Sequence, residues 1–149
     1  MEEKILLDNE RYVWLLIGQA RHIMTKARQK ELAPYEIFPQ QAQIIDVLYE
    51  LGRKATLTEL AKVSDRGVAS ISAQLTRMEK DGLVEKFREN RKSALKKFSL
   101  TEKGVNAHEI ISKRESIRAV MSVLSEEEYQ QLIPTLKKII DSSEKYLNS

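Results

Sequence analysis

Apolar residues recur at helical spacing in two adjacent stretches between residues 56 and 80, and the pattern predicts two short helices. Thr56 starts the first, because Thr56 and Glu59 have the Thr-x-x-Glu spacing of a capping box. Residues 64–67, Ser-Asp-Arg-Gly, form the breaker between the helices. The apolar side of the first helix consists of Leu57, Leu60, Ala61 and Val63.

The second helix combines an apolar stripe with a face of small and polar residues. Spacings of three and four residues are typical of a buried helix face, and here the stripe consists of Val68, Ile71, Leu75 and Met78. At about 100° per residue, the opposite face consists of Ala69, Ser70, Ala73, Thr76, Arg77 and Lys80, with Ser72 and Gln74 on its flanks. Asp81-Gly82 ends this helix, since glycine tolerates a left-handed conformation.

A basic hairpin of two strands is predicted next. The first strand contains Leu83, Val84 and Phe87, and the second runs from Ala94 to Leu100 with Leu95 and Phe98 as its bulkier positions. The tip between the strands reads Arg88-Glu89-Asn90-Arg91-Lys92-Ser93, and Thr101 caps the helix that follows. A helix that follows a turn can enter a DNA major groove, and a basic hairpin beside it can reach the backbone or the minor groove.

Positive charge is concentrated on this segment. Residues 52–103 carry 13 Lys and Arg against 7 Asp and Glu, a net charge of +6, whereas the whole chain carries +3. A solvated amphipathic helix and a charged edge that resists aggregation would explain the same residues without DNA. The order of the elements together with the charge favours nucleic-acid binding, because neutralised phosphates supply most non-specific affinity.

Three motifs in this order resemble the winged helix-turn-helix of the MarR family of bacterial transcription regulators. They are Leu57-Thr58-Glu59-Leu60-Ala61, Met78-Glu79-Lys80-Asp81-Gly82-Leu83-Val84 and Leu100-Thr101-Glu102-Lys103-Gly104. The wing tip reads Glu89-Asn90-Arg91-Lys92, where the family often has an Asp-x-Arg-Arg cluster, and Arg91 remains in place to enter a minor groove. Arg66-Gly67 replaces the more usual apolar residue and Ser or Thr cap.

The resemblance extends over nearly the full 149 residues and implies a mainly α fold with a small antiparallel β-wing. It implies one MarR-like domain over residues 1–149, with a DNA-binding winged helix at about 40–104. The helices at about 1–33 and 105–149 would intertwine with those of a second copy. The candidate DNA-binding residues are Arg66, Ala69, Ser70, Ser72, Ala73, Gln74, Arg77, Arg88, Asn90, Arg91, Lys92 and Ser93.

The termini carry long helical patterns. Asp8 can cap a helix that runs to about Leu32, and Pro34 ends it. Pro39 can start a second helix that stops at Gly52. After the wing, one helix is predicted from Thr101 to about Met121. Residues 125–128, Ser-Glu-Glu-Glu, form a capping box that opens a last helix, and Pro134 should kink it. These helices contain more apolar surface than a small winged helix can cover, which favours a homodimer over packing within one chain.

Sites for chemistry are scarce. The chain has no Cys, and His22 and His108 stand far apart in sequence, so each is interpreted as a surface or packing histidine rather than a metal ligand. Neither a Gly-rich phosphate loop nor a nucleophile with its base is recognisable. We therefore expect no enzyme activity, no cofactor and no metal. The aromatic residues Tyr12, Trp14, Tyr35 and Tyr49 are assigned either to a pocket for a small aromatic effector, which the resemblance implies, or to the core.

The sequence thus favours a cytoplasmic, homodimeric, sequence-specific regulator, most often a repressor in this family, that binds pseudo-palindromic double-stranded DNA. No apolar run approaches the ~20 residues of a membrane helix, so no membrane partner is expected. A winged helix used for protein–protein contact is the alternative.

Overall fold

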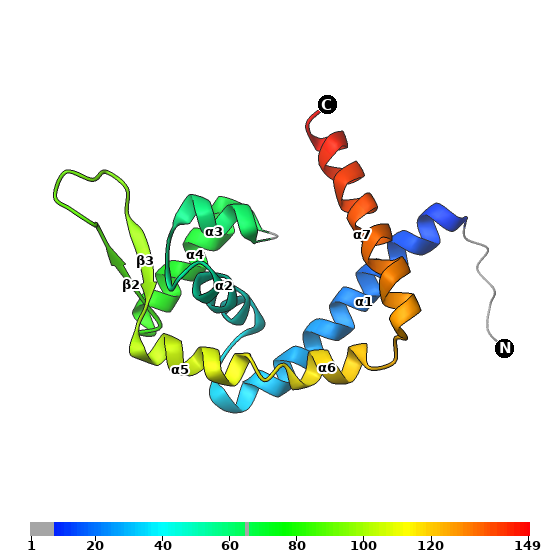
Figure 1. The fold of residues 1–149 in the computed structure, drawn as a ribbon, viewed down its shortest axis with the longest axis horizontal. Coiled ribbons are helices and arrows are strands. Elements are labelled where there is room, and N and C mark those ends of the chain that lie inside the picture. The colour runs from blue at the N-terminus through cyan, green and yellow to red at the C-terminus, as the bar shows by residue number, and fades with distance from the viewer. Residues whose placement is uncertain (1–7, 65) are drawn as a thin grey trace. The chain divides into compact units, whose positions relative to one another are not determined.

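The computed structural model describes residues 8–64 and 66–149, which form two compact units, one ending at Glu115 and the other beginning at Ser116 (Figure 1). The helices and strands are α1 (Asn9–Leu32), the 3-10 turn η1 (Ala33–Tyr35), α2 (Pro39–Glu50), β1 (Lys54–Thr56), α3 (Leu57–Val63), α4 (Val68–Lys80), β2 (Val84–Phe87), β3 (Lys97–Leu100), α5 (Glu102–Ile111), α6 (Glu115–Met121) and α7 (Glu126–Leu147).

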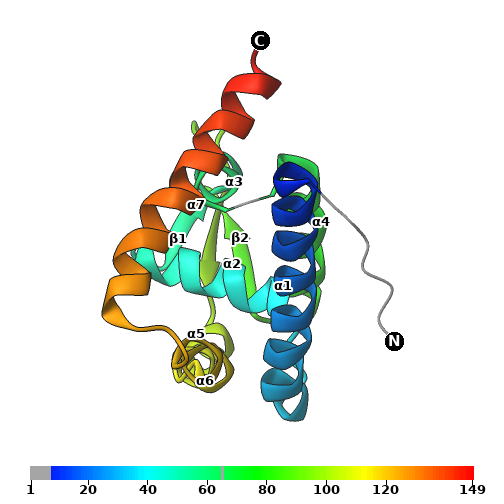
Figure 2. The same ribbon diagram turned by 90° about the vertical axis from the view of Figure 1, so that its right-hand side faces the viewer.

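The predicted ends of the first two helices are confirmed. The Asp8 carboxylate accepts a hydrogen bond of 2.8 Å from the Arg11 amide and so caps α1, which appears as one uninterrupted helix in Figure 2. Pro39 occupies the first turn of α2. Gly52 adopts φ +88° directly after that helix, a left-handed conformation that glycine adopts without steric cost.

The core of the first unit lies where α2, α3, α4 and α5 meet the sheet. It is built from side chains that leave at most 8% of their surface exposed, so one apolar cluster holds the winged helix together. Its members include Leu32, Ile44, Ile45, Leu48, Leu60, Ile71, Leu75, Met78, Val84, Phe98 and Ile111.

The wing belongs to a sheet of three strands rather than the predicted two. The strand order is β1-β3-β2, and both pairings are antiparallel. Ala55 of β1 lies opposite Phe98 of β3, and both are buried. The second wing strand is also shorter than predicted, because it begins at Lys97 and leaves Leu95 exposed in the loop.

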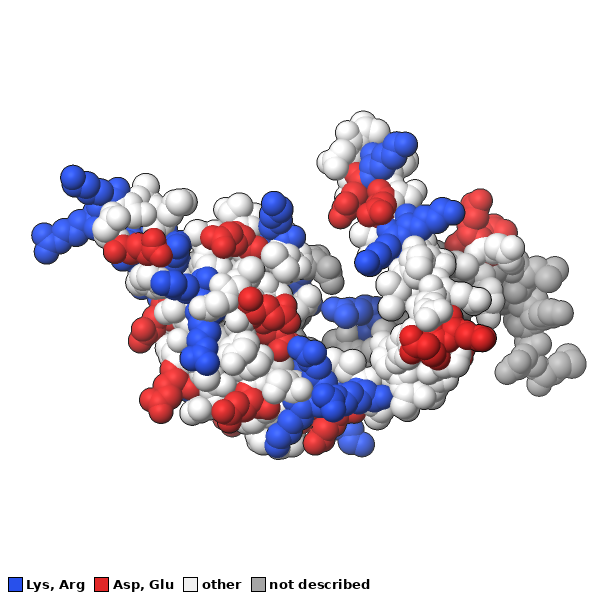
Figure 3. Space-filling model, in the orientation of Figure 1, with Lys and Arg blue, Asp and Glu red and all other residues white. Residues whose placement is uncertain are grey.

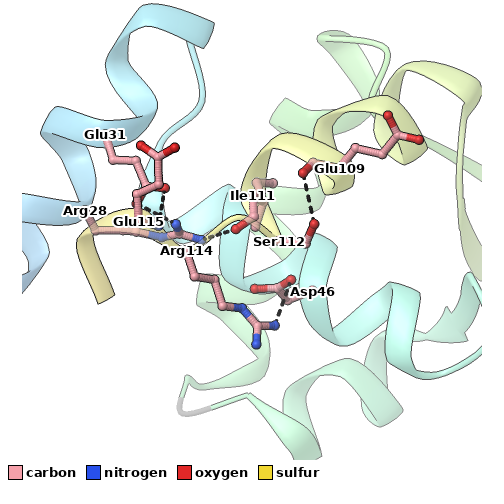
Figure 4. Close-up of polar contacts among 8 residues, drawn as sticks. All are labelled: Arg28, Glu31, Asp46, Glu109, Ile111, Ser112, Arg114 and Glu115. Carbon is pink, nitrogen blue, oxygen red and sulfur yellow. Dashed lines mark hydrogen bonds and ion pairs between the residues drawn. The ribbon is translucent and has the colours of Figure 1, made fainter. Parts of the chain in front are cut away.

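The prediction of one helix from Thr101 to about Met121 is wrong, because α5 ends at Ile111 and α6 begins at Glu115. Arg114 between them adopts φ +49°, which a continuous right-handed helix does not allow. Two side chains of α1 satisfy the interrupted backbone (Figure 4). Arg28 donates to the Ile111 carbonyl at 3.1 Å, and Glu31 accepts from the Glu115 amide at 2.9 Å.

The second unit contains the long helix α7. Its predicted capping box is confirmed, since Ser125 accepts from the Glu128 amide and Glu128 accepts from the Ser125 amide, at 3.2 and 3.1 Å. Pro134 lies inside the helix, as predicted. None of the α7 side chains is buried within the chain. Its exposed apolar positions include Leu132, Ile133, Leu136, Ile139, Ile140 and Leu147.

Candidate nucleic-acid interface

Helices α3 and α4 form the predicted helix-turn-helix. The capping box at the start of α3 is present, with the Thr56 hydroxyl accepting from the Glu59 amide at 3.1 Å. Ile71, Leu75 and Met78 of α4 are fully buried and anchor that helix in the core. Because one side of α4 is buried, its opposite side faces away from the core and is open to a partner.

The residues predicted for that open side are exposed or half-buried. Ala69, Ser70, Ala73 and Arg77 are exposed, whereas Ser72 and Gln74 are half-buried on the flanks. Small side chains at the start of a helix allow its backbone to approach a groove closely. Arg66 is half-buried in the turn before α4, and its neighbour Asp65 lies outside the described residues.

Two valines that the helical pattern predicts on the buried faces are exposed. Val68, in the first turn of α4, leaves 52% of its surface exposed, and Val63, at the end of α3, leaves 54%. Helical spacing alone could not separate Val68 from Ile71, because the stripe continues past the end of the core. Val68 thus adds an exposed apolar side chain to the first turn of α4, next to Ala69. Sequence reasoning therefore missed it as a candidate contact.

Two polar side chains of α4 contact the first turn of α2, which the sequence did not indicate. The Arg77 guanidinium lies 5.1 Å from the centroid of the Phe38 ring. The Gln74 side-chain amide donates to Gln40 Oε1 at 3.0 Å. Both partners lie at the start of α2, so these contacts hold the two side chains of α4 against that end of α2.

The tip of the wing presents the predicted basic residues to solvent. Arg88, Asn90, Arg91 and Lys92 are exposed and Ser93 is half-buried. Figure 3 shows blue Lys and Arg side chains that project from this tip. A local turn orders it, because Asn90 Oδ1 accepts from the Lys92 amide at 3.0 Å and the Asn90 carbonyl accepts from the Ser93 amide at 3.2 Å.

An ion pair joins the two sides of the wing below its tip. Lys97 Nζ lies 2.7 Å from Glu89 Oε1. The hydrogen bond and the positive charge of Lys97 lower the pKa of Glu89 below its ordinary value, and the charge of Lys54 adds to the effect. Lys97 is therefore the basic partner of Glu89 within the wing, and Arg91 remains exposed at the tip.

The histidines and most of the aromatic residues lie outside this interface. His108 stacks on Tyr49 with ring centroids 3.7 Å apart, while its Nε2 lies 3.5 Å from Asp46 Oδ1, so it is a packing histidine as expected. His22 is exposed. Tyr12, Trp14 and Tyr35 lie on the surface of the single chain, with Trp14 79% exposed, so they are not part of its core.

Over residues 8–64 and 66–149, His, Asp and Glu do not gather into a group that could hold a metal ion. Over the same residues, the helices all lack the length of apolar sequence needed to cross a membrane.

The fold and its exposed basic wing define a winged helix-turn-helix protein. The sequence pattern of the MarR family matches residues 37–93. Over these residues the chain is similar to the MarR family. Transcription regulation is the role of that family, in agreement with the expectation that the chain is not an enzyme.

Several solved structures are similar to the chain. The organohalide-sensing transcriptional regulator RdhR-CbdbA1625, in its 2,4-dichlorophenol-bound form, is 29% identical with a TM-score of 0.85, and the match covers 95% of this chain and 85% of that one. MepR of S. aureus in complex with DNA is 26% identical with a TM-score of 0.74, covering 88% and 96%. AbsC of Streptomyces coelicolor, a MarR family transcriptional regulator, shares the fold at 22% identity and a TM-score of 0.83, covering 96% and 99%. No curated protein sequence matches the chain.

Proposed function

We propose that the chain is a homodimeric, sequence-specific repressor that binds pseudo-palindromic double-stranded DNA and is released by a small-molecule effector. The observation that carries this proposal is the pairing of an open α4 face with a basic wing tip in one compact unit. The net charge of +6 over residues 52–103 suits a surface that neutralises phosphates. The similarity to MepR, solved with DNA, supports the same interface. A protein that regulates chromosomal genes in this way acts in the cytoplasm.

The homodimer is supported by apolar surface that a single chain leaves open. α7 exposes Leu136, Ile139 and Ile140 on one stripe, and α1 exposes Trp14 and neighbouring apolar residues. Exposed apolar surface of this kind is typical of an interface between subunits.

Sedimentation at micromolar concentration tests the dimer. We expect about twice the chain mass of 17.2 kDa. Ile140→Asp, on the stripe, should shift the protein toward monomer, whereas Lys138→Asp, on another side of α7, should leave the dimer intact. A wild-type monomer would contradict the proposal.

Selection from random duplex DNA tests sequence-specific binding. A two-fold dimer presents two α4 helices, so the selected sites should contain two half-sites about 10 bp apart, centre to centre. Asymmetric single half-sites would contradict the symmetric target. If no motif is selected and binding to duplex is undetectable, protein–protein contact becomes the better explanation of the winged helix.

The proposal of a small-molecule effector rests on the similarity to a regulator solved with 2,4-dichlorophenol. A panel of substituted phenols added to the complex of chain and selected operator tests this part. We expect at least one phenol to release the DNA at a concentration that leaves a non-specific duplex complex unchanged. Release of both complexes alike would indicate denaturation rather than regulation.

A further inference from the structure

The first turn of α2 contacts α4 at three successive points. Phe38 lies against Arg77, Gln40 accepts a hydrogen bond from Gln74, and Gln41 donates one to Asp81. Gln74 and Arg77 lie in the second half of α4, and Asp81 caps its C-terminal end. This turn, residues 38–41, therefore runs along the side of α4 that carries its longer polar side chains.

Gln41 fixes the position of the turn. It is 1% exposed, and both ends of its side-chain amide are used. Oε1 accepts from the Phe38 amide at 3.2 Å, and Nε2 donates to Asp81 Oδ2 at 3.4 Å. A buried amide with partners at both ends has little freedom, because any rotation would leave a polar atom unsatisfied. Phe38 and Gln40 thus stand on a rigid support.

The contact with Phe38 restricts the conformations of the Arg77 side chain but does not use its N–H donors. A guanidinium over an aromatic ring is attracted through its face, whereas its N–H groups point outward in its plane. The edge of Arg77 thus stays available for two parallel hydrogen bonds, the geometry with which arginine recognises guanine O6 and N7. A side chain already held in place loses less conformational freedom when it binds.

The contact with Gln40 has a corresponding effect on Gln74. One N–H of the Gln74 amide is used by Gln40 at 3.0 Å, which leaves its oxygen and its second N–H. An acceptor beside a donor is the pattern that recognises adenine N6 and N7. Gln40 therefore fixes the direction in which the oxygen and the second N–H of the Gln74 amide point.

We propose that Phe38 and Gln40 are positioning residues that determine sequence preference, by presenting Arg77 to a guanine and Gln74 to an adenine in the major groove. This inference rests on the proposed function. The inference goes beyond that function by placing part of the sequence specificity at the start of α2, outside the helix-turn-helix and the wing.

The test compares base preferences, which a purely structural role would not change at single positions. Random duplexes are selected with the full-length wild type, Arg77→Ala, Phe38→Leu, Phe38→Met and Phe38→Tyr. Leucine and methionine keep apolar volume but lack the aromatic ring, whereas tyrosine keeps it. We expect Phe38→Leu and Phe38→Met to reduce discrimination roughly 2- to 5-fold at the base pair that Arg77→Ala affects. Phe38→Tyr should retain the wild-type preference.

Gln40 is tested independently with Gln40→Met, which removes the acceptor and keeps the length of the side chain. Preference for adenine should fall roughly 2- to 10-fold at one position per half-site, the same position that Gln74→Ala affects. Gln43→Met, on the same helix, is the matched control and should select the wild-type motif. Circular dichroism and sedimentation of each variant establish that it is folded and assembled as the wild type is.

The outcomes separate this inference from the proposed function. If the wild type selects no motif, the proposed function fails. If the wild type selects a motif and Arg77→Ala and Gln74→Ala leave it unchanged, DNA binding stands and the positioning role is overturned. The role is also overturned if folded Phe38 and Gln40 variants keep preferences that Arg77→Ala and Gln74→Ala lose.

Discussion

A guanidinium nitrogen of Arg28 lies 3.1 Å from the carbonyl oxygen of Ile111, although 83 residues separate the two in sequence. Arg28 is 9% exposed and also pairs with Glu31 at 2.9 Å. The other carboxylate oxygen of Glu31 accepts from the Glu115 amide. One ion pair on α1 therefore serves both the end of α5 and the start of α6.

Replacement of Arg28 by methionine should destabilise the fold strongly. It removes a charged hydrogen bond and leaves the Glu31 carboxylate without its buried cation, so we expect a loss of about 3 kcal/mol in the free energy of unfolding. Urea denaturation at one fixed protein concentration measures the change. Lys26→Met, at an exposed position of the same helix, should change stability by less than about 0.5 kcal/mol. Equal effects of the two substitutions would contradict the role given to Arg28.

Gly104→Ala should destabilise the winged helix, although alanine normally favours a helix over glycine. A Cβ at this position would collide with the backbone carbonyl of Leu83 and lie 3.0 Å from Cδ2 of Leu100. Backbone cannot yield as a flexible side chain does, so we expect a net loss of about 1–3 kcal/mol. Asn106→Ala, at an exposed position of α5, is the control. A Gly104→Ala protein as stable as the wild type would show that α5 shifts at little cost.

The Glu89–Lys97 ion pair should make the wing sensitive to acid. Lys97 lowers the folded-state pKa of Glu89, so the pair stabilises the wing above the unfolded pKa and loses its effect as pH falls through the folded pKa. In Lys97→Gln the pKa of Glu89 should rise toward its ordinary value. NMR titration of the Glu89 carboxylate measures both proteins. Lys96→Gln should leave the titration close to that of the wild type, and a similar rise in both variants would exclude the specific pair.

Val68 should contact the methyl group of a thymine. Its exposed position in the first turn of α4 places an apolar side chain where a helix enters the major groove. Uracil in place of one thymine per half-site should weaken wild-type binding by about 0.8 kcal/mol, roughly fourfold, for each contact. Val68→Ala should lose this sensitivity. If uracil weakens wild type and Val68→Ala equally, another residue contacts the methyl group.

Arg91→Ala should distinguish two modes of wing binding. If Arg91 contacts phosphate, affinity should fall for every duplex, and the slope of log K against log salt should decrease by about one per site. If it enters a narrow A·T minor groove, the loss should fall mainly on operators with A·T flanks. Titrations on operator and random duplex over a range of salt separate the two. Affinity unchanged on both duplexes would remove Arg91 from the interface.

Local signals carried most of the prediction of the fold. The capping boxes at Thr56 and Ser125 and the stop at Gly52 each depend on residues within four positions of one another, so the sequence alone indicates them. The strand β1 is only three residues long and exists through pairing with β3, which no local pattern reveals. The break at Arg114 lacks glycine or proline and depends on contacts from α1.

Part of the candidate interface could also be predicted from local signals, and part could not. Helical periodicity correctly predicts that Ile71 and Leu75 of α4 are buried and that Ala73 is exposed. Periodicity does not indicate where the core ends, so it predicts Val68 as a core residue although Val68 is exposed. Phe38 and Arg77 are 39 positions apart in sequence, so only the tertiary structure reveals their contact.

The absence of buried side chains in α7 has a genetic consequence. A helix of 22 residues depends mainly on packing for its stability in water, so α7 must gain that stability from another surface. When a second copy supplies the surface, every assembled regulator combines two gene products. A copy with a defective α4 and an intact α7 would draw wild-type copies into inactive pairs, and its allele would be dominant. An allele that ends before Ser125 would be recessive, because its product could not join the wild type.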